Sequence, residues 1–436
     1  QKRLPENDRP RLYEFVQRLQ QYTATVTAKG LEDTALYRFY RLVSLNEVGG
    51  DPSRFGTTLA AFHRANQERC GRYPHTLLAT STHDSKRSED VRARINVISE
   101  AVEEWRRRLP RWSRLNRSKK RLVGQAWAPN RNDEYLFYQT LLGTWPLEEP
   151  DSDGLETLKE RLGSYMIKAA KEAKEYTSWA NPNPEYEKAL EYFVHAVLSR
   201  PGRNAFLADF LPFQRKVARA GLFNTLSQLV LKLTSPGVPD TYQGCELWSF
   251  NLVDPDNRRP VDFGFRAELL REIEERFASL RGPALGEAAR ALLHRPEDPR
   301  LKLYVTWRLL QFRLQNRSWL ARSGYRPLGA HGPQKSCLCA FAREADDGVL
   351  VTVVPRHLWS LCGGAPAPVG SDVWKDTWIE VPPRCSRLYN LLTGELVPVR
   401  QKGEAASLKV CEVLESFSVA VCHTKKSGGT GGGSAA

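Results

Sequence analysis

A histidine and an aspartate that follow a predicted strand are the residues of this chain best suited to chemistry. His83 and Asp84 come directly after residues 76–82, a run of Thr, Leu, Ala and Ser, and begin a polar segment that continues to residue 90. An aspartate accepts two hydroxyl hydrogen bonds and a histidine donates a third, which together can hold the adjacent hydroxyl groups of a sugar. The alternative is that Asp84 or Ser85 only caps the helix that follows.

The elements around this pair are predicted to be a strand that runs into a helix. Residues 76–82 have the composition of a strand, and apolar residues recur at helical spacing from residue 91. Such a unit is typical of a parallel sheet or barrel, in which chemistry takes place at the C-terminal ends of the strands. Residues 231–246 give a second signal of this kind, and a turn-rich loop follows at residues 254–260.

The rest of the chain divides into a helical and a strand-rich part. Residues 1–22 are predicted to be helical, residues 25–28 to form a short strand, and Asp33 to begin another helix. Residues 100–230 are predicted to be largely helical, with a break at residues 181–184. Short apolar or alternating runs predict antiparallel strands at residues 337–341, 349–354, 378–381 and 417–421.

The composition restricts the class of protein. Of the 436 residues, 41% are hydrophobic and 10% aromatic, which excludes a disordered chain. No apolar run approaches the ~20 residues of a membrane span. The net charge of +14 would suit a nucleic-acid partner, but residues 105–121 alone contain nine Lys/Arg and no acid. We expect this basic segment to be a solvated surface, and no nucleic acid or membrane to be bound.

The eight cysteines indicate a reducing cytoplasm, because they are too few and too scattered for a disulfide scaffold. Cys337 and Cys339 lack the further cysteines or histidines of a zinc site, so we expect no metal. The chain begins at Gln1 and contains a single methionine, Met166. From these two facts we expect it to be a piece of a longer protein.

Several long strings of the sequence resemble one family. Residues 78–94, together with residues 28–38, 45–52, 170–183 and 235–262, are similar to the maltooligosyl trehalose synthases, which are members of the α-amylase superfamily. The resemblance implies an α/β fold, the C-terminal part of a (β/α)8 TIM barrel with a helical insertion, followed by an antiparallel β domain. It also implies an intramolecular transglycosylation, in which the reducing-end α-1,4 bond of a maltooligosaccharide becomes the α,α-1,1 bond of a maltooligosyl trehalose.

On this resemblance the chain has five segments. They are residues 1–99, a barrel segment with about strands 6 and 7; residues 100–230, an inserted helical subdomain; residues 231–330, the last barrel strand and the helices after it; residues 331–424, the β domain; and residues 425–436, a disordered tail.

The resemblance also implies roles for individual residues. Asp84 matches the third catalytic carboxylate of the superfamily, which binds the 2- and 3-hydroxyls of the distorted sugar, and His83 donates to the same sugar. Five charged residues just beyond predicted strand ends are candidates for retaining the freed glucose, and three aromatic residues are candidates for stacking on sugars. These candidates are Lys29, Glu32, Asp33, Lys86 and Arg87, and Tyr37, Tyr242 and Trp179. Salt bridges, helix caps and core packing are the alternatives. Glu246 and Asp256 are expected only to orient neighbouring loops.

One departure from the family concerns the reaction itself. A retaining mechanism needs a nucleophilic carboxylate and an acid/base carboxylate roughly 5–5.5 Å apart. In the superfamily both lie upstream of the His-Asp motif, and their motifs are absent here. We therefore expect this chain alone to lack activity.

The pathway partner implied is maltooligosyl trehalose trehalohydrolase, and no organic cofactor is implied. Other hypotheses are an amylase-like hydrolase or transglycosylase, a non-catalytic glucan-binding module and a nucleic-acid binder.

Overall fold

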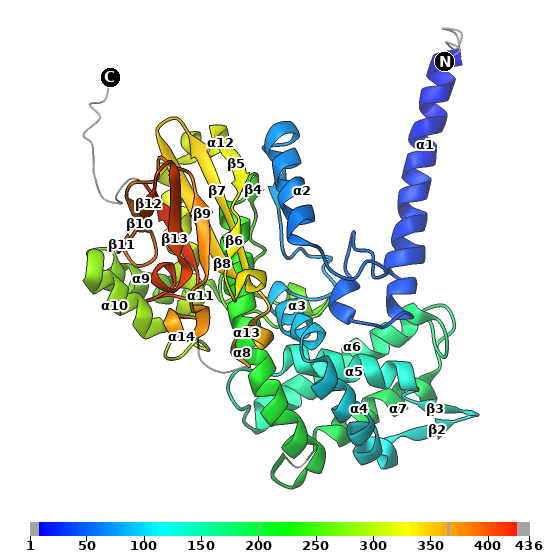
Figure 1. Ribbon diagram of the computed structural model, residues 1–436. Helices are drawn as coiled ribbons and strands as arrows, with labels where there is room; N and C mark the ends of the chain where they lie inside the picture. The colour runs from blue at the N-terminus through cyan, green and yellow to red at the C-terminus, as the bar shows by residue number, and fades with distance from the viewer. Residues whose placement is uncertain (1–7, 200, 364–366, 425–436) are drawn as a thin grey trace. The chain divides into compact units, whose positions relative to one another are not determined.

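The computed structural model describes residues 8–199, 201–363 and 367–424, and the predicted disordered tail lies outside them. The chain forms two compact units, each with its own internal contacts (Figure 1). Unit 1 comprises Gln1–Phe55, Leu109–Leu141 and Pro150–Ala208, and unit 2 comprises Gly56–Arg108, Leu142–Glu149 and Asp209–Ala436. The predicted segment boundaries at residues 99, 230 and 330 stay a prediction.

Unit 1 is mainly helical. Its elements are α1 (Arg9–Thr27), η2 (Ala28–Glu32), η3 (Ala35–Tyr37), η4 (Val43–Leu45), η6 (Arg117–Lys119), β2 (Arg121–Val123), β3 (Ala126–Ala128), α6 (Ser152–Ala173), α7 (Pro184–Val197) and η7 (Pro201–Arg203), with parts of α4 (Val102–Asn116), α5 (Arg131–Thr144) and α8 (Ala205–Thr234). Asn183 caps α7 by accepting from the Tyr186 amide at 3.2 Å, and Pro184 occupies the first turn. The predicted break at residues 181–184 is therefore confirmed.

Two predictions for the start of the chain are wrong. Residues 25–28, predicted as a strand, end α1 and begin the π-helical turn η2, because the local Thr/Val preference for strands has no partner strand to satisfy it. The helix predicted from Asp33 is reduced to the short turns η3 and η4. Asn46 explains the interruption, since its side-chain amide donates to the carbonyls of Leu36 and Phe39 at 2.8 Å each.

The basic segment of residues 105–121 is solvated on one face, as expected. It forms most of α4, whose Trp105 and Trp112 are buried, whereas Arg106, Arg107 and Arg111 are exposed.

Unit 2, as far as its residues are described, combines helices with three sheets. Its elements are α2 (Leu59–Arg72), β1 (Leu77–Leu78), α3 (Glu89–Asn96), η5 (Val97–Ser99), β4 (Val238–Pro239), η8 (Asp256–Arg258), α9 (Phe263–Phe277), α10 (Gly282–Leu292), α11 (Arg300–Gln315), α12 (Arg317–Arg322), β5 (Gly324–Pro327), β6 (Ala330–His331), η9 (Lys335–Cys337), β7 (Leu338–Ala345), β8 (Gly348–Pro355), α13 (Leu358–Cys362), α14 (Gly370–Trp374), β9 (Trp378–Val381), β10 (Leu388–Asn390), β11 (Leu396–Val397), β12 (Arg400–Lys402), β13 (Ala405–Lys409), α15 (Val410–Val413) and β14 (Ala420–His423), together with the remaining parts of α4, α5 and α8.

Two antiparallel sheets occupy the C-terminal part of unit 2. One has the strand order β11-β10-β14-β8-β7-β5 and the other β12-β13-β9-β6. Strands β7, β8 and β9 overlap the predicted runs at residues 337–341, 349–354 and 378–381. Side chains from both sheets, such as Ala340 of β7, Val351 of β8 and Leu408 of β13, belong to one buried core. Helices α11 and α12 contact the six-stranded sheet at His423 of β14, whose ring centre lies 5.2 Å from that of Phe312 and 5.3 Å from that of Trp319.

A short parallel pair precedes the candidate site. Strand β1 pairs with β4, with Leu77 opposite Val238 and Leu78 opposite Pro239. The predicted strand of residues 76–82 is thus real but short. The run at residues 231–234, also predicted as strand, is instead the end of the long helix α8. A buried helix and a buried strand give the same continuous apolar sequence, which explains the error.

Candidate functional site

The pair His83–Asp84 lies in an exposed turn between β1 and α3. His83 Nε2 and Asp84 Oδ2 are 3.1 Å apart, and the two side chains are 64% and 61% exposed. On its other side, Asp84 Oδ1 lies 3.5 Å from Nη2 of Arg258. The carboxylate is therefore flanked by a histidine and a guanidinium but still faces solvent, where it is able to accept hydrogen bonds from ligand hydroxyls.

The cap alternative for this turn is wrong. Helix α3 begins at Glu89 with Ser88 in the N-cap position, so neither Asp84 nor Ser85 caps it. Ser85 Oγ instead accepts from the Thr82 amide at 2.8 Å and closes the turn.

The loop after β4 is hydrogen-bonded to the backbone of the His83 turn. The Asn257 side-chain amide donates to the His83 carbonyl at 2.8 Å, and the Tyr242 hydroxyl donates to the Asn257 carbonyl at 3.0 Å. Asp256 accepts from the Leu252 amide at 2.8 Å, which orients the same loop as expected. Sequence reasoning missed Asn257 and Arg258 as neighbours of the pair. The turn-rich composition of residues 254–260 was the available signal.

The other unit 2 candidates are placed differently. The side chains of Lys86 and Arg87 are buried, with 6% and 3% exposure, and the Arg87 backbone bridges to Leu252. Glu246, expected to orient a loop, forms a close ion pair with Arg266. In unit 2 the structure therefore brings His83, Asp84 and Tyr242 together around the Asn257 turn.

The remaining candidates lie in unit 1. Lys29 pairs with Asp33 across one helical turn, with 2.6 Å between Nζ and Oδ2. Glu32 Oε1 accepts from the Gly49 amide at 2.9 Å. Tyr37 is buried, with 4% exposure.

Trp179 is 58% exposed on the loop between α6 and α7, and the Lys171 ammonium lies 4.8 Å from its ring centre. Of the three aromatic candidates, Trp179 thus offers the most open ring for stacking on a sugar.

A buried carboxylate supports the loop that carries Trp179. Asp133 accepts from the Tyr186 hydroxyl at 2.7 Å, and Tyr186 stacks on Tyr176 with ring centres 4.9 Å apart. Burial raises the pKa of Asp133 to about 6, and nearby Glu175 adds to the rise while Tyr186 opposes it.

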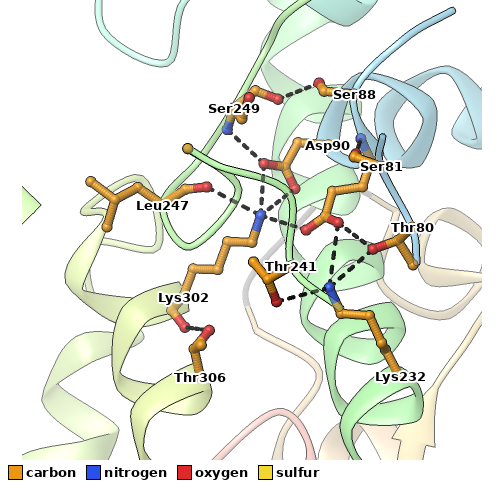
Figure 2. Close-up of polar contacts among 12 residues, drawn as sticks. Thr80, Ser81, Ser88, Asp90, Lys232, Thr241, Leu247, Ser249, Lys302 and Thr306 are labelled. Atoms are coloured by element: carbon orange, nitrogen blue, oxygen red, sulfur yellow. Dashed lines mark hydrogen bonds and ion pairs between the residues drawn. The ribbon is translucent and has the colours of Figure 1, made fainter. Parts of the chain in front are cut away.

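Four charged side chains are buried next to Thr80 and Ser88, which flank the segment that carries His83 and Asp84 along the chain; Figure 2 shows three of them, Asp90, Lys232 and Lys302. We call Glu89, Asp90, Lys232 and Lys302 the buried charge cluster; their exposures are 2%, 1%, 5% and 0%. The Lys302 ammonium lies 2.8 Å from Glu89 Oε1 and 3.0 Å from Asp90 Oδ2, and it donates to the Leu247 carbonyl at 3.1 Å.

The second lysine of the cluster binds its threonine neighbours. Lys232 Nζ is 3.1 Å from Thr80 Oγ1 and 3.4 Å from Thr241 Oγ1, with Glu89 Oε2 at 3.8 Å. Burial alone would raise the pKa of Glu89, but Lys302 and Lys232 outweigh it and lower that pKa to about 2. Burial would lower the pKa of Lys302, whereas Asp90 and Glu89 raise it above its ordinary value. Burial raises the pKa of Asp90 and Glu89 adds to the rise, whereas Lys302 opposes it. The cluster therefore pairs two acidic with two basic side chains.

Among the residues that the structure describes, no three His, Cys, Asp or Glu side chains are grouped to hold a metal ion. Within the same residues, no helix is both long and apolar enough to cross a bilayer.

Comparison with known proteins finds relatives along most of the chain. A Mycobacterium tuberculosis protein named as a maltooligosyl trehalose synthase is 37% identical over 339 residues, which are 77% of this chain and 38% of that protein. The solved maltooligosyltrehalose synthase of Arthrobacter ramosus superposes with a TM-score of 0.73 at 34% identity, over 93% of this chain and 46% of that one. Another solved maltooligosyl trehalose synthase gives a TM-score of 0.71 at 31% identity, over 97% and 50%.

No protein-family model matches the chain. The chain spans between about two fifths and one half of the length of these relatives.

Proposed function

We propose that this chain, which is related to the maltooligosyl trehalose synthases along most of its length, acts as the C-terminal part of such a synthase and supplies the His83–Asp84 pair to its sugar site. The observation that carries the proposal is the position of the pair. It is an exposed carboxylate with a histidine at 3.1 Å, at the C-terminal end of a parallel strand. In this proposal β1 and β4 belong to the last strands of a (β/α)8 barrel, and the sheets from β5 onward form the β domain.

The chemistry of the pair suits a distorted sugar ring. Asp84 accepts hydrogen bonds from the 2- and 3-hydroxyls, which become more acidic as the ring approaches an oxocarbenium-like transition state. These hydrogen bonds therefore strengthen in the transition state and accelerate the reaction rather than only binding the substrate. Arg258 Nη2 lies 3.5 Å from Asp84 Oδ1, and His83 donates to the same sugar.

The mutase reaction requires two further carboxylates that this chain does not supply in our proposal. The freed glucose must stay bound while it turns to attack the glycosyl-enzyme, and water must be excluded. Lys29, Glu32, Asp33 and Trp179 of unit 1 are proposed contacts for the retained sugars. Tyr37, Lys86 and Arg87 are buried, so we propose that they position the backbone near the sugar rather than contact it.

The proposed substrate is a maltooligosaccharide or the end of an α-1,4-glucan. Its product would be consumed by maltooligosyl trehalose trehalohydrolase, and the proposed location is the cytoplasm. Analysis of the product of the complete enzyme distinguishes this proposal from an amylase-like hydrolase, because trehalose-type ends do not reduce whereas released glucose does.

The test uses binding, which does not require the missing carboxylates. Titration calorimetry of the full chain with maltohexaose should show binding, and Asp84→Asn should weaken it by about tenfold or more, since one charged acceptor is lost. Asp347→Asn is the matched control, because Asp347 is an exposed aspartate that pairs with Arg322 at 2.9 Å. Equal affinity of wild type and Asp84→Asn would remove Asp84 from the sugar site.

A further inference from the structure

We propose that Lys302 is a positioning residue for the His83–Asp84 pair and acts through Glu89 and Asp90 of the buried charge cluster. The expected effect of Lys302 on sugar binding rests on the function proposed above. Its effect on the position of the His83–Asp84 turn does not depend on that function. Lys302 lies on α11, more than two hundred residues along the chain from this turn.

The first step of the argument is that the cluster holds both ends of the segment that carries the pair. At the front end, Thr80 donates to the Glu89 carboxylate, and Ser81 Oγ accepts from the Glu89 amide at 2.9 Å. At the back end, Ser88 Oγ donates to the Ser249 carbonyl at 2.5 Å. Figure 2 shows Thr80 beside Lys232, and Ser88 in contact with Ser249, which in turn contacts Asp90. Residues 82–84 project from these two attachments.

The second step is that the same ammonium also holds the opposite loop. Lys302 donates to the Leu247 carbonyl, and Asp90 accepts from the Ser249 amide at 2.6 Å (Figure 2). The chain then continues to Asn251, whose carbonyl accepts from the Ser88 amide at 2.9 Å. It goes on to Asn257, which holds the His83 carbonyl. One buried charge therefore links α3 to the loop that grips the His83 turn.

The third step is electrostatic. With Lys302 removed, Asp90 would lose its contacts with the ammonium at 3.1 and 3.0 Å, while Glu89 would keep Lys232 at 3.8 Å. The buried Arg94 would still interact with the charge of Asp90. An uncompensated buried charge must regain water, bind a proton or move. A movement of Glu89 or Asp90 displaces Thr80, Ser81 or Ser249, because these residues are hydrogen-bonded to them and also hold the turn. Sites that act on a substrate tolerate displacements of only about 0.5 Å. Such a movement would therefore weaken sugar binding by the His83–Asp84 pair.

The experiment separates positioning from stability with two variants of the full chain. Lys302→Met removes the ammonium and keeps the length of the side chain. Lys302→Met/Asp90→Asn removes one charge of each sign, so the cluster is balanced again but its link to the Leu247 carbonyl is lost. Lys159→Met is the matched control, since Lys159 is a buried lysine of α6 paired with Glu156 at 2.6 Å.

Three readouts are compared: the midpoint of thermal unfolding, the affinity for maltohexaose, and the His83 ring resonance in NMR spectra of histidine-labelled protein, identified by its loss in His83→Gln. Lys302→Met should lower the midpoint, shift or broaden the His83 resonance and weaken binding by about tenfold. The double variant should regain most of the midpoint, while the resonance and the affinity stay changed. Lys159→Met should leave the His83 resonance and the affinity for maltohexaose unchanged.

Two results would overturn the proposal: an unchanged His83 resonance in Lys302→Met, or recovery of the resonance and the affinity together with the midpoint in the double variant. If Lys302→Met does not fold, the double variant decides by the same criterion. If the wild-type chain does not bind maltohexaose, the proposed function fails, and the His83 resonance alone still tests the positioning role.

Discussion

Replacing Asp133 with asparagine should stabilise unit 1 near neutral pH. Asp133 is 6% exposed, and burial raises its pKa from 3.8 to about 6. One pKa unit corresponds to about 1.4 kcal/mol, so keeping this carboxyl ionised in the folded chain costs about 3 kcal/mol relative to the unfolded chain. Asn is uncharged and nearly the same size, and its oxygen can still accept from the Tyr186 hydroxyl. We therefore expect Asp133→Asn to recover much of this free energy.

The pH dependence gives the sign of the effect. The folded pKa is the higher one, so the penalty is absent below the unfolded pKa of 3.8 and complete above about 6. Asp133→Asn should raise the free energy of unfolding by about 2–3 kcal/mol at about pH 7.5 and change it little at about pH 4.

The assay is urea unfolding followed by tryptophan fluorescence at both pH values. Asp153→Asn is the control, because Asp153 is exposed in the first turn of α6 and its loss should cost a few tenths of a kcal/mol. A variant that is less stable than wild type at pH 7.5, or equally shifted at both pH values, would refute the reasoning.

Two further predictions concern the cluster and the exposed tryptophan. The pKa of Glu89 falls from 4.5 to about 2 on folding, so it contributes about 3 kcal/mol that is present above about pH 5 and lost as the pH falls towards 2. Urea unfolding between these pH values should show a steeper loss for wild type than for Glu89→Gln; parallel curves would contradict this. Trp179→Ala should weaken maltohexaose binding by about tenfold without lowering the unfolding midpoint, because the ring is 58% exposed. Trp127→Ala, with a ring 53% exposed on β3, is its control, and equal affinities of the two variants would exclude the stacking role.

Elements that are marked by periodicity or turn residues within a short stretch of sequence could be predicted. Helix α3, the break before α7 and the strands β7–β9 were found from periodicity and turn residues. The error at residues 231–234 arose because α8 is apolar around much of its circumference, so the period that distinguishes a helix from a strand is lost.

Part of the candidate site could not be predicted from local patterns. The sequence shows Glu89 and Asp90 as members of a polar segment, which usually indicates a solvated helix start. Their burial depends on Lys232 and Lys302, which are supplied by helices far along the chain, and no local pattern reports such a pairing. Arg258 and Asn257 were missed for the same reason, although their loop was recognised as rich in turns.

Helix α1, at the blue end of Figure 1, has a consequence for how the chain opens. None of its 19 residues is buried, and Leu12, Phe15, Leu19, Tyr22 and Val26 are between 42% and 69% exposed. Isolated helices of about this length are marginal in water, because packing normally supplies most of their stability. Helix α6, by contrast, has ten buried residues. Amide hydrogens of α1 should therefore exchange with solvent through local fraying, well before those of α6, which require its buried face to open.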